Sequence, residues 1–244
     1  MAKKKIAILY GGRSVEHGVS INSAKNIYQF IDRKLFEPYL IGITQEGDWR
    51  LTKEVSSSIK KGEKLSLRLN AGKPTFKTKS TKFTPDIVFP VLHGTDGEDG
   101  SIQGLLKALD LPMVGTGVLG SAMSMNKLVA KVILKAEGLP VADFLYAYFD
   151  ERKNVSFETI KKKLGLPFMV KSASLGSSVG VSKVKSKEDF QKALADGFKY
   201  DDCVLFEKYI QGREIECAIL GNASAKASLP GEIIISKKHD FYTF

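Results

Sequence analysis

The strongest constraint on the fold of this sequence is the alternation of short apolar runs with helical patterns in its first half. Residues 6–10 are apolar and end at Gly11-Gly12, and a helical pattern begins where Ser20 can cap it. Residues 39–43 and 86–92 are further apolar runs. This alternation is typical of a parallel α/β sheet, whose ligands bind at the loops that follow its strands. We therefore predict an α/β N-terminal domain with a parallel sheet.

The pattern changes near Gly120, after a further short strand expected at 111–114. One long helix is predicted from Ser121 to Gly138, and a capping box from Ser186 to Asp189 begins another. Strand patterns follow one another closely here, which favours antiparallel pairing in an α+β fold. The strands are expected at 141–149, 168–171, 179–184, 203–209 and 214–220, with a short helix near 157–164.

Composition and charge exclude several classes of protein. Hydrophobic residues are 43% and charged residues 26% of the 244, which is ordinary for a globular protein. No apolar run approaches the ~20 residues of a membrane span, so we expect no membrane partner. Seven of the ten net positive charges lie in residues 51–82, which hold few aromatics and no nucleic-acid-binding motif. We expect a solvated hairpin or long loop there, and no nucleic-acid partner.

The two cysteines, Cys203 and Cys217, lie in apolar, strand-like runs. They have neither the C-x-x-C spacing nor the nearby histidines of a zinc site. We predict buried free thiols in a reducing compartment, and therefore a cytoplasmic protein.

Two nucleotide-binding templates apply to this sequence. Residues 115–120 fit G-x-G-x-x-G, but a dinucleotide site needs an acid at the end of the next strand. Glu137 lies at a helix end and Asp143 early in a strand, so an NAD-dependent oxidoreductase is the remote alternative. The Walker A pattern is absent from the sequence.

A second glycine-rich loop, residues 173–180, follows an apolar run that ends in Lys171. Glycines allow close backbone approach to a ligand, and consecutive amides can bind an anion. A tight hairpin explains the same residues, and Lys127 in the preceding helix can be a solvated charge. Residues 206–214 fit either an edge that binds a base and ribose through Glu214 or a charged hairpin.

Candidate acids and histidines lie in the two loops that follow predicted strands. Ser14, Glu16 and His17 lie in the first loop, where a carboxylate beside a glycine turn can pair with an ammonium group. The second loop contains His93, which can equally be a hydrogen-bonded loop histidine. Its carboxylates, Asp96, Glu98 and Asp99, do not have the EF-hand spacing, and we expect no metal site among them.

Together, these motifs resemble the D-alanine–D-alanine ligase family, ATP-grasp enzymes of bacterial cell-wall synthesis. The resemblance covers nearly the whole chain, and several separate motifs agree in order. They are residues 11–17, 93–104, 114–117 with 121–122 and 125–127, 170–171 with 176–180, and 206–210 with 212–214.

The resemblance implies an N-terminal substrate domain at 1–120, a central ATP-grasp domain at 121–212 and the start of a C-terminal ATP-grasp domain at 213–244. It implies ligation of two D-alanines through an acylphosphate. Glu16 and Ser177 are the implied catalytic residues, and Glu16, His93 and Glu98 the implied substrate-binding residues. The implied ATP-binding residues are Lys127, Lys171, Ser177, Ser178, Glu207, Lys208, Tyr209, Ile210 and Glu214.

The chain departs from the family pattern in two ways. The family commonly has Met-Asp-Lys and Lys-Pro where this chain has Met125-Asn126-Lys127 and Lys171-Ser172. In the family a further stretch follows the position of Phe244, with an arginine and the Mg²⁺ ligands. We therefore expect an incomplete C-terminal portion and little or no ligase activity from these 244 residues alone. A non-catalytic nucleotide-binding module and a D-alanine–D-lactate type ligase are the alternatives. A homodimer is implied by the family alone.

Overall fold

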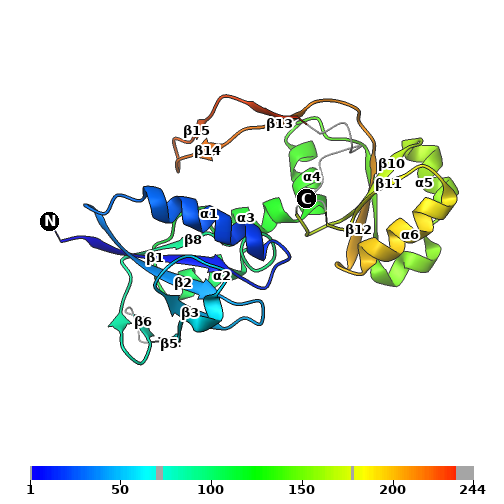
Figure 1. Ribbon diagram of the computed structural model, residues 1–244. Helices are drawn as coiled ribbons and strands as arrows, with labels where there is room; N and C mark the ends of the chain where they lie inside the picture. The colour runs from blue at the N-terminus through cyan, green and yellow to red at the C-terminus, as the bar shows by residue number, and fades with distance from the viewer. Residues whose placement is uncertain (1, 70–73, 177–178, 235–244) are drawn as a thin grey trace. The chain divides into compact units, whose positions relative to one another are not determined.

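A computed structural model of the chain describes residues 2–69, 74–176 and 179–234. The chain divides into two compact units, residues 1–133 and 134–244 (Figure 1). The two units are described separately below. The three-part division at 120 and 212 stays a prediction.

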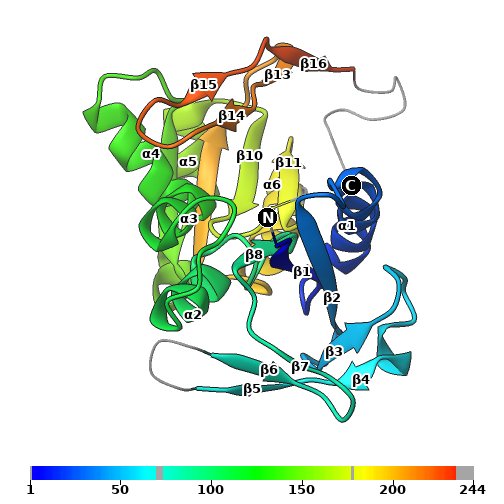
Figure 2. The same cartoon turned by 90° about the vertical axis from the view of Figure 1, so that its left-hand side faces the viewer.

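The first unit contains a five-stranded sheet in the order β4-β3-β2-β1-β8 (Figure 2). Its centre is parallel, because β1 (Lys4–Gly11) pairs in parallel with β2 (Phe36–Ile43) and with β8 (Ile87–Pro90). The strands β3 (Trp49–Thr52) and β4 (Glu63–Lys64) extend it in antiparallel fashion. The parallel sheet predicted from the apolar runs is confirmed, with an antiparallel extension on one side.

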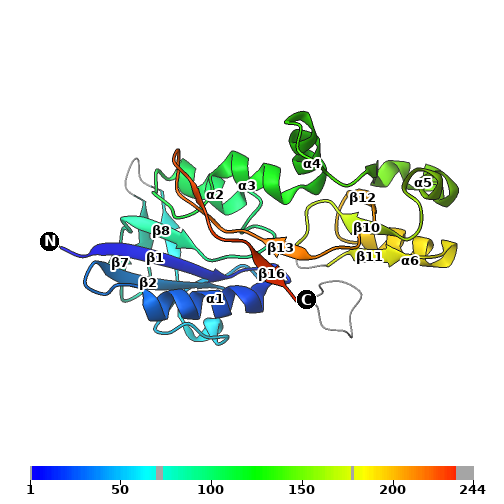
Figure 3. The same ribbon diagram turned by 90° about the horizontal axis from the view of Figure 1, so that it is seen from above.

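Helices cover both faces of this sheet (Figure 3). The helix α1 (His17–Phe30) packs on the face that carries Ile8 and Tyr10. The helix α2 (Ser101–Ala108) packs on the other face, where Leu9 is also buried. Burial on both faces explains why the central strands are continuous apolar runs rather than alternating ones.

The basic segment forms a three-stranded sheet of β5 (Ser66–Arg68), β6 (Thr75–Lys77) and β7 (Lys82–Phe83), in that order. Phe76 and Phe83 are 0% and 4% exposed and belong to the same core as α2. The expected solvated hairpin is therefore half correct: one face is solvated, and the other completes the core.

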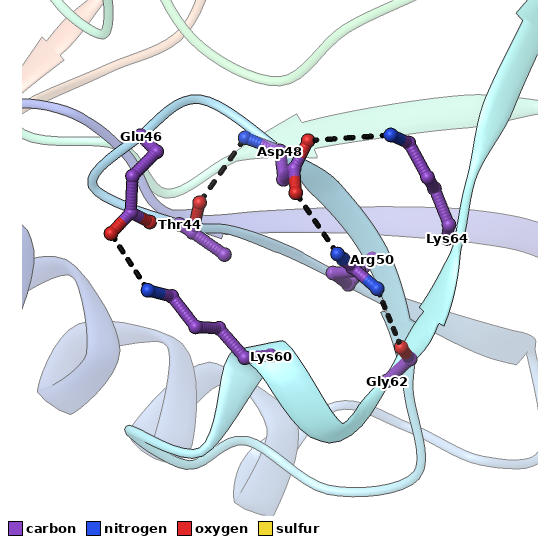
Figure 4. Close-up of polar contacts among 7 residues, drawn as sticks. All are labelled: Thr44, Glu46, Asp48, Arg50, Lys60, Gly62 and Lys64. Carbon is purple, nitrogen blue, oxygen red and sulfur yellow. Dashed lines mark hydrogen bonds and ion pairs between the residues drawn. The ribbon is translucent and has the colours of Figure 1, made fainter.

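A charged network joins β3, β4 and the 3₁₀ helix η1 (Ile59–Lys61), which lies between them in the chain (Figure 4). Lys60 pairs with Glu46 at 2.7 Å, and Asp48 pairs with Arg50 at 2.9 Å and with Lys64 at 3.8 Å. These pairs lie mostly in solvent, so each contributes little to stability.

The predicted start of α1 is wrong. Glu16 occupies the N-cap position, and Ser20 lies fully buried inside the helix. The Ser20 hydroxyl accepts a hydrogen bond from the Gly11 amide at 2.8 Å and donates one to the Val91 carbonyl. This serine therefore ties the helix to the ends of two strands instead of capping it.

The single helix predicted from Ser121 is also wrong. Two helices, α3 (Val118–Met125) and α4 (Lys127–Ala136), meet at Asn126, whose ψ of 106° interrupts the helical backbone. The Asn126 side chain accepts a hydrogen bond from the Val129 amide at 3.0 Å, as an N-cap does. The short strand expected at 111–114 is reduced to one parallel bridge between Val88 and Met113.

The second unit contains an antiparallel sheet in the order β11-β10-β12-β9. Its strands are β9 (Phe144–Tyr148), β10 (Phe168–Ser172), β11 (Val181–Val184) and β12 (Cys203–Lys208). The antiparallel pairing predicted for this half of the chain is confirmed.

Two helices, α5 (Phe157–Leu164) and α6 (Lys187–Phe198), pack on one face of this sheet. The predicted capping box of α6 is present, because Ser186 accepts from the Asp189 amide at 3.2 Å and Asp189 accepts from the Ser186 amide. Phe168 and Phe206 point into this core. A 3₁₀ helix, η2 (Phe149–Asn154), follows β9.

The last described residues form two short ribbons. One pairs β13 (Glu214–Glu216) with β16 (Gly231–Ile233), and the other pairs β14 (Ile219–Leu220) with β15 (Lys226–Ala227). Leu220 is 83% exposed. Cys203 is a buried free thiol as predicted, but Cys217 lies exposed in the ribbon, so its predicted burial is wrong.

The predicted fold class, a parallel α/β unit followed by a second α+β unit, is confirmed. Over the part of the chain that the structure describes, none of the helices is long and apolar enough to cross a membrane.

Candidate active site

The first candidate region lies at the carboxyl ends of β1 and β8. Gly11 and Gly12 turn the chain with φ angles of +88° and +95°. A Cβ atom on Gly11 would collide with the Ile43 carbonyl, so only glycine fits where β1 leaves the sheet. This turn places the following loop beside the loop that leaves β8.

Glu16 lies at the meeting point of the two loops. Its side chain is buried, with the residue 6% exposed, and its backbone amide donates to the Ser14 hydroxyl at 3.1 Å. Gly94 contacts it from the second loop so closely that a Cβ there would collide with the Glu16 carboxylate and the Ser14 hydroxyl. Glu16 also occupies the N-cap position of α1 without a side-chain capping hydrogen bond, and the helix dipole there favours a negative charge.

His93 and Glu98 are anchored on either side of Gly94. The His93 Nε2 lies 3.0 Å from the Ser23 hydroxyl of α1, and the Glu98 carboxylate accepts from the Gly94 amide at 2.8 Å. The structure thus brings Glu16, His93 and Glu98 around one glycine. His93 is hydrogen-bonded, as expected if it is an ordinary structural histidine of a loop.

Further contacts fix the shape of the second loop. Asp96 has a φ of +66° and pairs with Arg13 at 2.7 Å. Burial raises the pKa of Asp99, but hydrogen bonds from the Asp96 and Ser101 amides outweigh it and hold that pKa below its ordinary value. The carboxylates of the loop therefore hold its shape.

Two cavities open beside this loop. One, of about 420 Å³, is lined by Glu98 together with Gln103, Ser121 and Met125. The other, of about 370 Å³, is lined by His93 with other loop residues. His93 and Glu98 thus border different cavities in this unit, and their assignment to one substrate site stays a prediction.

Gln103 is a buried polar residue that the sequence reasoning did not single out. It is 5% exposed, and its Nε2 donates to the Gly97 carbonyl at 2.7 Å. Its Oε1 is buried and has no hydrogen-bond partner within the described ranges. Its position inside the motif 93–104 is the sequence feature that could have identified Gln103 as a candidate.

The second candidate region is the helix-free face of the antiparallel sheet, the face opposite α5 and α6, where Met169, Leu205 and Glu207 are nonetheless buried. Strand alternation directs Phe168 and Val170 into the helix-covered core, and Met169 and Lys171 to the opposite face. Lys171 forms an ion pair there with Glu207 of β12, and their side chains are 25% and 9% exposed. The register places Glu207 opposite Met169, so the pair is diagonal across β10 and β12.

The other predicted base and ribose residues follow this pair along the chain. Lys208 ends β12, where its amide donates to the Asp143 carbonyl at 2.9 Å. The Lys183 ammonium lies 3.9 Å from the centre of the Tyr209 ring. Ile210 is 65% exposed, and Glu214 begins β13 opposite Ile233.

The remaining predicted residues lie elsewhere. Lys127 is the first residue of α4, directly after the cap Asn126, and belongs to the first unit. Ser177 and Ser178 lie outside the described residues.

The groups that could hold a metal ion are the acidic, histidine and cysteine side chains of the described residues. In the ranges that the structure describes, no three His, Cys, Asp or Glu side chains gather closely enough to hold a metal ion. Mg²⁺ prefers one or two carboxylates together with phosphate oxygens. We therefore derive no step through a metal from these residues.

The two units match two family models. Residues 5–116 match the model described as "D-ala D-ala ligase N-terminus", and residues 133–244 match "D-ala D-ala ligase C-terminus". The fold and both candidate regions therefore define a ligase-type, ATP-grasp protein. The chain belongs to the D-alanine–D-alanine ligase family, as its motifs predicted.

Relatives and solved structures agree with this assignment. A D-alanine–D-alanine ligase of Thermoanaerobacter sp. is 46% identical, over 100% of this chain and 70% of its own length. The Coxiella burnetii D-alanine–D-alanine ligase structure has a TM-score of 0.88 at 39% identity, covering 95% of this chain and 71% of that one. The VanG D-Ala:D-Ser ligase of Enterococcus faecalis has a TM-score of 0.87 at 30% identity, covering 100% and 73%.

Proposed function

We propose that this chain is the amino-acid- and nucleotide-binding part of an ATP-dependent ligase that joins two D-alanines for peptidoglycan precursor synthesis. The observation that supports it most is the buried Glu16 carboxylate, which two strand-end loops enclose around Gly94. A carboxylate enclosed by two loops in this way can bind a small partner of opposite charge. The ammonium group of an amino acid is such a partner.

In the amino-acid region, Glu16 pairs with the ammonium of the first D-alanine. His93 and Glu98 support the same substrate from the second loop, where Ser23 and Gly94 hold their side chains. Preset donors and acceptors of this kind reduce the entropy cost of orienting a small substrate. The catalytic role predicted for Ser177 stays a prediction, because Ser177 lies outside the described residues.

In the nucleotide region, Lys171 neutralises phosphate oxygens. Lys127, Ser177 and Ser178 stay predicted ATP-binding residues, because Lys127 belongs to the first unit and the two serines lie outside the described residues. Glu207, Lys208, Tyr209 and Ile210 frame the adenine, and Glu214 accepts from the ribose hydroxyls. The Lys171–Glu207 pair supports this proposal, because it sets a cation and an acceptor side by side on the helix-free face of the sheet. Lysine binds phosphate as a point charge.

The proposed chemistry has two steps. The carboxylate of the first D-alanine attacks the γ-phosphate of ATP to form an acylphosphate and ADP. The amine of the second D-alanine then attacks the acyl carbon, and phosphate leaves. Because both steps depend on charge neutralisation and alignment, the protein contributes positioning rather than a nucleophile of its own. Mg²⁺ bound with ATP supplies further charge neutralisation.

We further propose that these 244 residues alone turn over little or no substrate. The chain spans 69% to 73% of the relatives described above and of similar ones. Among the described residues, Leu220 of β14 and Leu229, which precedes β16, are 83% and 91% exposed. A region left so open holds water, which competes for an acylphosphate.

The second substrate, the assembly state and the location are also matters of proposal. D-alanine is the acceptor we favour, and D-lactate is the alternative. A homodimer in the cytoplasm agrees with the family assignment.

The test for the amino-acid region is a D-alanine binding experiment. Saturation-transfer NMR measures the binding, and L-alanine is the competitor. We expect D-alanine to bind and Glu16→Gln to weaken it roughly tenfold or more, because a charge-assisted hydrogen bond is lost. The matched control is Glu37→Gln, an exposed carboxylate on β2, which leaves binding unchanged. Equal binding by Glu16→Gln and the parent chain would sink the assignment of Glu16.

The test for turnover is phosphate release from Mg-ATP on a sample of verified mass, with D-alanine or with D-alanine plus D-lactate. We expect no release from the 244 residues with either. Release with D-alanine would support the ligase assignment and contradict the proposed inactivity of the isolated chain. Release that needs D-lactate would replace the proposed acceptor.

A further inference from the structure

The outer face of the small sheet β5-β6-β7 concentrates positive charge. Strand pairing sets Ser66, Lys77 and Lys82 in one row across the three strands, and Leu67, Phe76 and Phe83 in the next row. The second row faces the core, where Phe76 and Phe83 are buried. The first row therefore faces outward, and both of its lysines are exposed.

Lys77 and Lys82 are direct neighbours across antiparallel strands, where Cβ atoms lie about 4.5–5.5 Å apart. Like charges at such positions destabilise a sheet. Arg68 and Lys79 are exposed beside them, and none of these four cations forms an ion pair within the described residues. The arrangement is unfavourable for the isolated protein and favourable once a multivalent anion covers it.

Nearby acids are already occupied by other groups. Glu63 accepts hydrogen bonds from the Ser80 hydroxyl and amide, at 2.6 Å and 3.1 Å. Asp48 pairs with Arg50 and Lys64, and Glu46 with Lys60 (Figure 4). The network of Figure 4 thus pairs Lys64 of β4 and Lys60 of η1 with acids, and leaves the outer face of β5-β6-β7 uncompensated.

The shape of this face selects among anionic partners. Its aromatic rings, Phe76 and Phe83, point into the core, so this face offers no stacking platform for bases. It also presents no helix to enter a DNA groove. Leu69, 71% exposed, follows Arg68 at the end of β5, where one apolar side chain beside cations suits the boundary of a lipid layer. The sheet lies at the margin of the first unit (Figures 1 and 2).

We infer that the outer face of β5-β6-β7, defined by Arg68, Lys77, Lys79 and Lys82, docks on the anionic phospholipid headgroups of a membrane surface. This contact requires no membrane-spanning segment. It revises the expectation of no membrane partner, which rested on the lack of a long apolar run. The inference is independent of the proposed ligase activity.

The test is co-sedimentation of the whole chain with sucrose-loaded vesicles. One set contains phosphatidylcholine alone, and the other contains phosphatidylcholine and phosphatidylglycerol in equal parts. We expect sedimentation only with phosphatidylglycerol, and less of it as salt rises, because salt screens exposed charges. Equal sedimentation with both sets would overturn the inference.

The deciding variant is the triple change Arg68→Gln, Lys77→Gln and Lys82→Gln. Each cation contributes roughly fivefold to binding at an anionic surface, so the triple variant should bind roughly a hundredfold more weakly. The matched control, Lys162→Gln, Lys187→Gln and Lys192→Gln, removes the same charge from exposed positions on α5 and α6 and should leave binding unchanged. An equal loss in the control would mean that net charge, not this face, drives binding.

Two further measurements keep the inference open to refutation. The double variant Lys77→Arg and Lys82→Arg should retain binding, which separates loss of charge from loss of folding. Duplex DNA at equal phosphate concentration should fail to displace the protein from phosphatidylglycerol vesicles. Displacement by DNA would make a nucleic acid the partner and overturn the lipid assignment.

Discussion

The five-stranded sheet and the four-stranded sheet of this protein differ in how helices cover their faces. In the first unit, α1 covers one face of a mainly parallel sheet and α2 covers the other. In the second unit, α5 and α6 cover only one face of an antiparallel sheet, and Lys171 and Glu207 pair on the other. A sheet covered on both sides can bind a ligand only at its strand ends. A sheet with helices on one side only can also bind it through side chains on its helix-free face, such as Lys171.

This difference explains where the candidate residues lie in each unit. Glu16, His93 and Glu98 all follow strand ends and are held by loop contacts. Lys171 and Glu207 lie within strands, and the register of β10 and β12 holds them. Loss of a loop glycine should therefore damage the first region, whereas loss of core packing should damage the second.

The largest expected effect is on the covered face of the second sheet. Phe168 is 0% exposed and packs against Phe157 and Phe190. Phe168→Ala should lower the free energy of unfolding by about 3–5 kcal/mol, because it removes a buried aromatic ring and leaves a cavity. Tyr146 lies on the helix-free face and is 51% exposed. Tyr146→Ala should lower the free energy of unfolding by about 1 kcal/mol or less. Urea unfolding of both variants measures the difference, and equal costs would mean that both faces are packed.

The next effect is on the loop region of the first sheet. Gly94→Ala should cost about 2 kcal/mol or more and abolish D-alanine binding, because φ is +71° and a Cβ collides with Glu16. Gly104→Ala, inside α2 with no atom near its Cβ, should instead stabilise by about 0.5–1 kcal/mol. Thermal unfolding and D-alanine titration of both variants check this. A Gly94→Ala protein that binds normally would show that the enclosed Glu16 is not the substrate contact.

A smaller effect is expected on the outer face of β5-β6-β7. Lys82→Glu places an acid opposite Lys77 and should raise the free energy of unfolding by about 0.2–1 kcal/mol. The same change should remove vesicle binding. The control Lys82→Gln should give about half the stabilisation, because it removes the repulsion without adding an attraction. Denaturant curves that show a loss of stability would contradict the facing geometry of the two lysines.

The smallest effect concerns pH. The hydrogen bond from Lys60 lowers the pKa of Glu46 from 4.5 to about 2. Because the folded pKa is depressed, the pair contributes stability above pH 4.5, and this contribution is lost as pH falls toward 2. Glu46→Gln should therefore match the parent chain at the acidic end and be slightly less stable at neutral pH. Urea midpoints for both proteins across this window test it, and a constant difference would contradict it.

Much of the fold could be predicted from the sequence, because hydrophobic periodicity is local. The runs at 6–10 and 39–43 became β1 and β2, and the capping box at Ser186 began α6. The strands β1, β2, β8 and β9 to β12 were predicted correctly even where their ends shifted by a few residues. The strand expected at 111–114 is a single bridge, and the one expected at 214–220 divides into β13 and β14. Motif order also identified the family, because several loops had to agree at once.

The errors came from contacts between residues far apart in sequence. Ser20 was predicted as a cap, but its hydroxyl bonds to Gly11 and Val91, and no local pattern indicates that. Phe76 and Phe83 lie in a basic segment, so composition hid their place in the core. The Lys171–Glu207 pair depends on strand register, which sequence spacing alone does not specify.

The central claim is that the helix-free face of the second sheet is a nucleotide site. Calorimetric titration of ATP into the parent chain, Lys171→Gln and the matched control Lys162→Gln tests it most directly. Lys162 is exposed on α5, which covers the opposite face of the sheet. We predict that the parent chain and the control bind ATP alike and that Lys171→Gln binds roughly tenfold or more weakly, because a charged hydrogen bond to phosphate is lost. Equal affinity in all three proteins would contradict the claim.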